Sequence, residues 1–144
     1  MYKHILVAVE NSDADRTILS HVSELARLTG ARLLLVHVAD GFAARHFDDL
    51  KLRESEEMRA DREYLTELET TLRGEGFSVC SELAMGDPAT ELIRVSQAEG
   101  VDLLAMATHG HRFLADVVKG TTVDRVRHLV KTPVLLLRAH QSTT

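Results

Sequence analysis

The sequence predicts an α/β domain built on a doubly wound, five-stranded parallel sheet. Short and almost wholly apolar segments alternate along the chain with segments whose apolar residues recur every three or four positions. Segments of the first kind are typical of strands buried on both faces, and those of the second kind of amphipathic helices. Parallel strands joined through helices require right-handed crossovers, so helices are expected on both faces of the sheet. The 144 residues suffice for one such domain, expected to span residues 1–144.

Local signals mark the first strand, the first helix and the second strand. An apolar run within Lys3–Val9 predicts a buried strand. Residues 11–13 (Asn-Ser-Asp) are of the types that cap helix N-termini, and Gly30 lies where the end of a helix favours a positive φ. The helical stripe between these signals consists of Ile18, Val22, Leu25 and Leu28. Arg32–Val38 then predicts a second buried strand.

The middle of the chain is expected to hold a loop, two helices and a strand. Residues 39–52 show no clear period, and a charged helix is expected over Arg53–Arg73. Apolar and polar residues alternate more in Phe77–Met85 than in the other strands, which predicts a strand that is less buried. Residues 86–88 (Gly-Asp-Pro) combine a turn, an N-cap and a proline at the first helical position, which is a strong helix start. Gly100 is expected to end that helix.

Two strands and one helix are expected in the rest of the chain. Val101–Ala107 predicts a strand, and residues 108–119 are expected to form a loop with at most one helical turn. Thr121–Lys131 predicts a helix that stops at the Thr-Pro pair after it. Val134–Leu137 predicts the last strand, and residues 139–144 are expected to form a flexible tail.

The expected strand order, 3-2-1-4-5, places a ligand site. In such a sheet the order reverses between the first and fourth strands, and ligands bind beyond the carboxyl ends of the strands at that point. The segments that emerge there are residues 9–12, 38–40 and 107–110. Topology therefore predicts a pocket between these segments, without naming what the pocket binds.

The segment after the fourth strand has features that suit an anion. Gly110 would let backbone N–H groups approach a ligand closely. Residues 120–122 (Gly-Thr-Thr) are expected to open a helix, and a helix N-terminus attracts negative charge. Arg112 and Lys119 add positive charge to the same loop. These features favour a phosphate site, and the alternative is a plain turn followed by an ordinary helix cap.

Several stretches of the chain together resemble the universal stress protein family. They are YKHILVAVENS, LLLVHV, GDPATELI, THGHRFLADVVKGTTVDRV and TPVLLL. The nucleotide-binding branch of that family carries the motif Gly-x2-Gly-x9-Gly-Ser/Thr. Here Gly110, Gly120 and Thr121 match the later positions, and Ala107 replaces the first glycine. The acidic residue after the first strand, usually Asp in the family, is Glu10.

The resemblance implies a cytoplasmic stress-response or regulatory protein that binds an adenine nucleotide, with ATP, ADP and AMP as candidates. Backbone groups near Val38 would bind the adenine, Glu10 the ribose or a metal, and the glycine loop with Thr121 the phosphates. Whether Mg²⁺ or Mn²⁺ accompanies the nucleotide stays open. The expected contact residues are Ala8, Val9, Glu10, Val38, Met106, Ala107, His109, Gly110, Arg112, Gly120, Thr121 and Thr122.

The resemblance also implies a homodimer that forms through the last strand. In the expected order, Val134–Leu137 is a sheet edge, and its three leucines are apolar with no Lys or Pro among them. Edges of this kind invite pairing with another chain, and a closed twofold pairing would cover the edge in both copies.

Composition narrows the remaining function classes. The net charge of −5 argues against nonspecific nucleic-acid binding, and no apolar run approaches the roughly 20 residues that span a bilayer. The single cysteine, Cys80, excludes an intrachain disulfide and is consistent with the cytoplasm. The sequence has no P-loop motif, which argues against a P-loop ATPase. His109 and His111 alone do not predict a metal site. No pair of residues forms a convincing nucleophile and base for catalysis. A nucleotide-free dimeric scaffold and a slow ATPase remain the alternatives.

Overall fold

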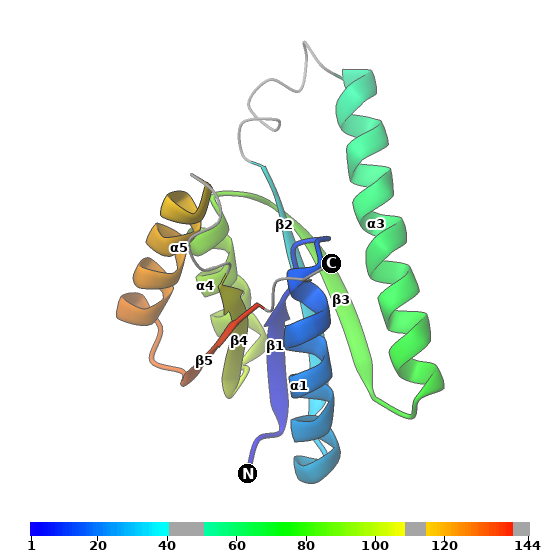
Figure 1. Ribbon diagram of the computed structural model, residues 1–144, viewed down its shortest axis with the longest axis vertical. Coiled ribbons are helices and arrows are strands. Elements are labelled where there is room, and N and C mark those ends of the chain that lie inside the picture. Colours follow the sequence, from blue (N-terminus) through cyan, green and yellow to red (C-terminus); the bar gives the residue numbers. More distant parts are fainter. Residues whose placement is uncertain (41–50, 109–114, 140–144) are drawn as a thin grey trace.

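The fold is a parallel five-stranded sheet between two layers of helices (Figure 1). The computed structural model describes residues 1–40, 51–108 and 115–139. Its elements are β1 (His4–Ala8), α1 (Ala14–Thr29), β2 (Arg32–Asp40), α3 (Lys51–Gly74), β3 (Val79–Gly86), α4 (Pro88–Glu99), β4 (Leu103–Thr108), α5 (Ala115–Leu129) and β5 (Val134–Arg138). The strands pair in parallel in the order β3-β2-β1-β4-β5. Both the fold class and the strand order predicted from the sequence are confirmed.

Separate hydrophobic clusters cover the two faces of the sheet. Successive strand residues point to opposite faces, so Ile5 and Val7 of β1 pack on the side of α1 and α3, and Leu6 packs on the side of α4 and α5. The helices contribute buried residues to the first cluster (Ile18, Val22, Leu65 and Leu72) and to the second (Leu92, Val95 and Val126). The sheet is therefore buried on both faces, as the continuous apolar strands require.

Most of the predicted element boundaries are confirmed because strong turn signals lie at them. Gly30 and Gly100 cap the ends of α1 and α4 with φ of 74° and 62°, the left-handed conformation in which glycine avoids a side-chain clash. At the start of α4, the carboxylate of Asp87 accepts a hydrogen bond from the Thr90 amide at 2.9 Å, and Pro88 occupies the first turn.

The start of α5 differs from the prediction. The helix begins at Ala115, so residues 120–122 lie inside it and not at its N-terminus. Beyond the first turn of a helix, each amide donates to the carbonyl four residues earlier. The predicted helix N-terminus at Gly120 is therefore wrong. The physical reason is that one glycine costs a helix only about 1 kcal/mol, which does not force a boundary.

The described residues include the strand ends that lead to the predicted pocket, and residues 41–50 and 109–114 beside them lie outside the described residues. Residues 39–52 were expected to be a loop, but residues 39 and 40 end β2 and residues 51 and 52 begin α3. Residues 41–50 lie outside the described residues. The predicted tail falls mostly outside them as well. No helix in the described ranges is both long and apolar enough to cross a bilayer.

Candidate functional site

A cavity of about 220 Å³ lies at the carboxyl ends of β1, β2 and β4, under the first turns of α4. This is the point at which the strand order reverses, where ligands of doubly wound sheets bind. The lining residues are Ala8, Val9, Glu10, Val36, His37, Val38, Pro88, Leu92 and Met106. The structure therefore has a cavity at the place that topology predicts.

The walls of the cavity are mostly apolar. Val36, Leu92 and Met106 belong to the hydrophobic cluster under α4 and α5, and each is less than a tenth exposed. A flat apolar group would remove these side chains from water without losing polar contacts. Pockets for small molecules combine such walls with a few polar groups that fix orientation.

The backbone of Val38 supplies polar groups on one side of the cavity. The last paired residues of β1 and β2 are Ala8 and Val36. Beyond this pair, the Val36 carbonyl accepts a hydrogen bond from the Val9 amide at 2.9 Å. Backbone groups of alternate residues in a strand point to the same neighbouring strand. The N–H and C=O of Val38 therefore point toward the β1 side, beyond the last described β1–β2 pair. A ligand at this place would meet one donor and one acceptor side by side.

Glu10 supplies a carboxylate to the wall of the cavity. Its Oε2 accepts a hydrogen bond from the Ser12 hydroxyl at 3.2 Å. Glu10 belongs to the turn of residues 9–12 between β1 and α1, here called the β1–α1 turn, in which Asn11 has φ of 62°. Non-glycine residues adopt that left-handed conformation seldom, and Asn is among those that tolerate it best.

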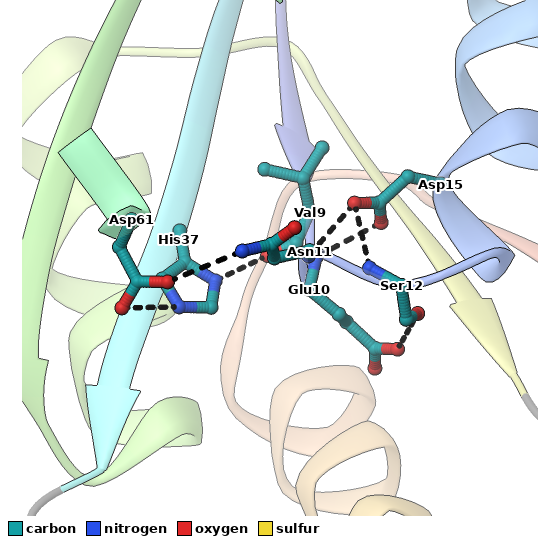
Figure 2. A network of polar contacts seen from close by, with 7 residues as sticks. All are labelled: Val9, Glu10, Asn11, Ser12, Asp15, His37 and Asp61. Atoms are coloured by element: carbon teal, nitrogen blue, oxygen red, sulfur yellow. Dashed lines mark hydrogen bonds and ion pairs between the residues drawn. The ribbon is translucent and has the colours of Figure 1, made fainter. Parts of the chain in front are cut away.

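The carboxylate of Asp15 holds this turn from the side of α1 (Figure 2). It accepts hydrogen bonds from the amides of Glu10 and Asn11, each at 2.8 Å, and a longer one from Ser12 at 3.4 Å. Asp15 is only 2% exposed. These amides form the kind of concave donor group that binds anions, but the chain's own carboxylate occupies it. A phosphate of a bound ligand has no access to these donors.

Two residues of α3 reach the same region. The Tyr64 hydroxyl donates a short hydrogen bond to Asp15, and burial, together with that bond and the Asp15 charge, raises the pKa of Tyr64 well above its usual value. Asp61, one helical turn earlier, lies 3.4 Å from His37 Nε2. Its other oxygen accepts a 3.5 Å hydrogen bond from the Asn11 side-chain amide. The Nδ1 of His37 lies 2.9 Å from the Val9 carbonyl (Figure 2).

The structure brings together part of the predicted contact set. Cavity-lining residues that were predicted are Ala8, Val9, Glu10, Val38 and Met106. Ala107 instead packs against the cluster on the α1 and α3 side of the sheet. Thr122 lies within α5 and does not line the cavity. His109, Gly110 and Arg112 lie outside the described residues. Gly120 and Thr121 belong to α5, and the side chain of Thr121 lies outside the described part of the chain.

Several residues of the site were not predicted from the sequence. Pro88 and Leu92 line the cavity because α4 packs over β2 and the first turn of the helix overhangs the strand ends. Asp15 lies three residues before Ile18 in α1, and Asp61 lies four residues before Leu65 in α3. Each aspartate is therefore on the buried face of its helix. A charged residue in such a register is the signal that could have identified them. Among the described residues, no group of three or more His, Cys, Asp or Glu side chains could hold a metal ion.

Comparison with known proteins finds matches over nearly the whole chain. A sequence profile described as the Universal stress protein family matches residues 1–138. Universal stress protein MJ0577 of Methanocaldococcus jannaschii is 26% identical, and the alignment covers 99% of this chain and 98% of that protein. The solved structure of MJ0577 superimposes with a TM-score of 0.85 at 24% identity and covers 99% of each chain.

Two other similar structures were solved with a ligand. The universal stress protein from Archaeoglobus fulgidus in complex with dAMP has a TM-score of 0.69 at 22% identity, covering 94% of this chain and 97% of that one. A universal stress protein in complex with cAMP has a TM-score of 0.69 at 18% identity, covering 96% and 98%. At these identities the likeness shows the shared fold.

Proposed function

Because the chain belongs to the universal stress protein family, we propose that it binds an adenine nucleotide in the cavity at the ends of β1, β2 and β4. The observation that carries the proposal is the arrangement of the cavity: an apolar wall, the exposed backbone edge of Val38 and the carboxylate of Glu10. The complexes of two relatives with dAMP and cAMP support the same class of ligand.

Each part of the cavity suits one part of the nucleotide. The base would pack against Leu92 and Met106, and its edge would meet the N–H and C=O of Val38. Adenine presents an amino donor beside a ring-nitrogen acceptor, whereas guanine presents a carbonyl acceptor in place of that amino group. Adenine therefore pairs with the Val38 edge and guanine does not. The Glu10 carboxylate would accept hydrogen bonds from the ribose hydroxyls.

The phosphates would extend away from the β1–α1 turn, because Asp15 already occupies the amides there. We propose that Gly110, Arg112, Gly120, Thr121 and Thr122, together with His109, form the phosphate end, without Ala107, which packs on the α1 and α3 side of the sheet. ATP, ADP and AMP are the candidate ligands, and Mg²⁺ or Mn²⁺ would accompany ATP if Glu10 also binds a metal.

Titration calorimetry tests this proposal directly. ATP, ADP, AMP and, as a control, GMP are titrated into protein that has been freed of ligand and shown to be folded by circular dichroism. We expect heat from at least one adenine nucleotide and none from GMP. Glu10→Gln keeps the size of the side chain and should weaken binding about two- to tenfold, the value of one net hydrogen bond. No heat and no thermal protection from any adenine nucleotide would favour a nucleotide-free scaffold.

We further propose that the protein acts as a binding module in a cytoplasmic stress response, and that any ATP hydrolysis is slow. No P-loop lysine follows Gly120. The Ser12 hydroxyl donates to the Glu10 carboxylate and accepts from the Ala14 amide at the start of α1, contacts that suit a residue at a helix start better than a nucleophile. Phosphate release from ATP with Mg²⁺ or Mn²⁺ should stay below roughly 1 s⁻¹, the low end for enzymes. A faster rate would favour the enzyme alternative.

The dimer belongs to the same proposal, with residues 1–144 as one domain in each copy. β5 is an edge of the sheet, and its apolar side chains are half-buried within the single chain. We propose that Val134–Leu137 pairs with the same strand of a second copy across a twofold axis, which would cover the edge.

A further inference from the structure

The β1–α1 turn forms one wall of the cavity, and two side chains of α3 reach it through other residues. Asp61 and Tyr64 lie on the same side of the helix because residues three apart are neighbours on a helix surface. Tyr64 contacts the turn through Asp15, and Asp61 contacts it through His37 and directly at Asn11. The long charged helix α3 is therefore connected to the β1–α1 turn, which contains Val9 and Glu10.

The two ring nitrogens of His37 contact two different elements of the site. Its Nδ1 faces the Val9 carbonyl, and its Nε2 faces the Asp61 carboxylate. His37 therefore links the Asp61 carboxylate of α3 to the backbone carbonyl of Val9. The ring is only 14% exposed and Asp61 only 18%, which limits the access of water to this pair.

We propose that Asp61 and Tyr64 are positioning residues of the nucleotide site, which hold the β1–α1 turn in the conformation that presents Glu10 to the ribose. This inference rests on the proposed function. Neither residue lines the cavity, so each acts through another residue: Asp61 through His37 and Asn11, and Tyr64 through Asp15.

The backbone of the turn explains why such support matters. Asn11 lies in the left-handed region, and residues held there persist only when the surrounding structure fixes them. Asp15 fixes the turn from α1, and Asp61 fixes Val9 and Asn11 from the side of α3 (Figure 2). Loss of the α3 contacts would let the turn relax, and the carboxylate of Glu10 would move away from its place in the cavity.

The test uses three variants of the whole chain: Asp61→Ala, Tyr64→Phe and the control Glu67→Ala. Glu67 is exposed on the same helix, and its replacement removes the same charge as that of Asp61. Titration with AMP and ATP should show about two- to tenfold weaker binding for the first two variants, the value of a net hydrogen bond, and no change for the control. Circular dichroism establishes that each variant is folded.

A double-mutant cycle separates positioning from a general loss of structure. If Asp61 acts by placing Glu10, Asp61→Ala should weaken binding much less in protein that already carries Glu10→Gln. An equal loss in both backgrounds would overturn the proposal, and so would unchanged affinity in both Asp61→Ala and Tyr64→Phe.

A second readout needs no nucleotide. In ¹⁵N-labelled protein, the signals of the His37 imidazole and of the Val9 and Asn11 amides should shift in Asp61→Ala relative to wild type and should stay in place in Glu67→Ala, because Asp61 contacts His37 and Asn11. If wild type binds no adenine nucleotide, the proposed function fails, while the His37 signals still report whether Asp61 holds the turn. Unchanged His37 signals in Asp61→Ala would overturn the inference by themselves.

Discussion

Asp15→Asn should destabilise the fold more than any other conservative change at the start of α1. The substitution keeps the size of the side chain but removes the charge and one of its two acceptor oxygens. The carboxylate accepts from the Glu10 and Asn11 amides at 2.8 Å, from Ser12 at 3.4 Å and from the Tyr64 hydroxyl. The new amide group would point N–H donors at backbone N–H donors.

The size of the effect follows from these contacts. A hydrogen bond to a charged group contributes about 1.5–3 kcal/mol net. We count only the two 2.8 Å bonds and use the lower value, because Asn can retain part of the network. The free energy of unfolding should then fall by about 3 kcal/mol. For a chain of this length, that loss lowers Tm by about 6–12 °C.

Asp13→Asn is the matched control. Asp13 occupies the N-cap position of the same helix, but its side chain makes no cap hydrogen bond and is exposed. The same chemical change should therefore alter stability by less than about 0.5 kcal/mol, as is usual for surface positions. Urea unfolding of wild type and both variants measures the differences. A loss below about 1 kcal/mol in Asp15→Asn, the value of one ordinary hydrogen bond, would refute the role assigned to the carboxylate.

Three further predictions concern the rest of the fold. Gly30→Ala should cost about 1–2 kcal/mol in chemical unfolding because φ is 74° there and left-handed backbone penalises a Cβ, while Gly74→Ala should be neutral. Hydrogen bonds from Thr90 lower the pKa of Asp87, so the Asp87 carboxylate stabilises the fold above about pH 4 and loses this contribution as the pH falls below that value. Asp87→Asn should therefore flatten the acid side of a plot of Tm against pH. An unchanged plot would contradict this role of Asp87. Leu136→Lys should shift the protein from dimer to monomer in light scattering, and an unchanged dimer would place the interface elsewhere.

Sequence patterns predicted the sheet because its signals are local and strong. A wholly apolar strand has one stable environment, between two helix layers. Gly30, Gly100 and the pair Asp87-Pro88 mark boundaries through backbone conformation, which does not depend on distant residues. The start of α5 was missed because the four residues before Ala115 in the sequence include no Ser, Thr, Asp or Asn, whereas Gly120 offers a false boundary inside the helix.

The location of the site was predicted by topology, but the support of its turn was not. The contacts among Asp15, Asp61, His37 and Tyr64 join residues up to 49 positions apart, and they depend on how α1 and α3 pack against each other. No motif records that packing. The sequence does, however, place Asp15 and Asp61 in register with Ile18–Val22 and Leu65–Leu72.

The placement of Asp15 and Asp61 on the buried faces of α1 and α3 also points to the site. A carboxylate on a buried helical stripe costs free energy unless the fold supplies partners for it, so its presence indicates that partners exist nearby. For Asp15 the partners are backbone amides of the β1–α1 turn, and for Asp61 they are His37 and Asn11. Both sets belong to the segments that line or flank the cavity. The acidic residues on the two inward stripes therefore point to the same turn as the strand order does, from information that is independent of topology.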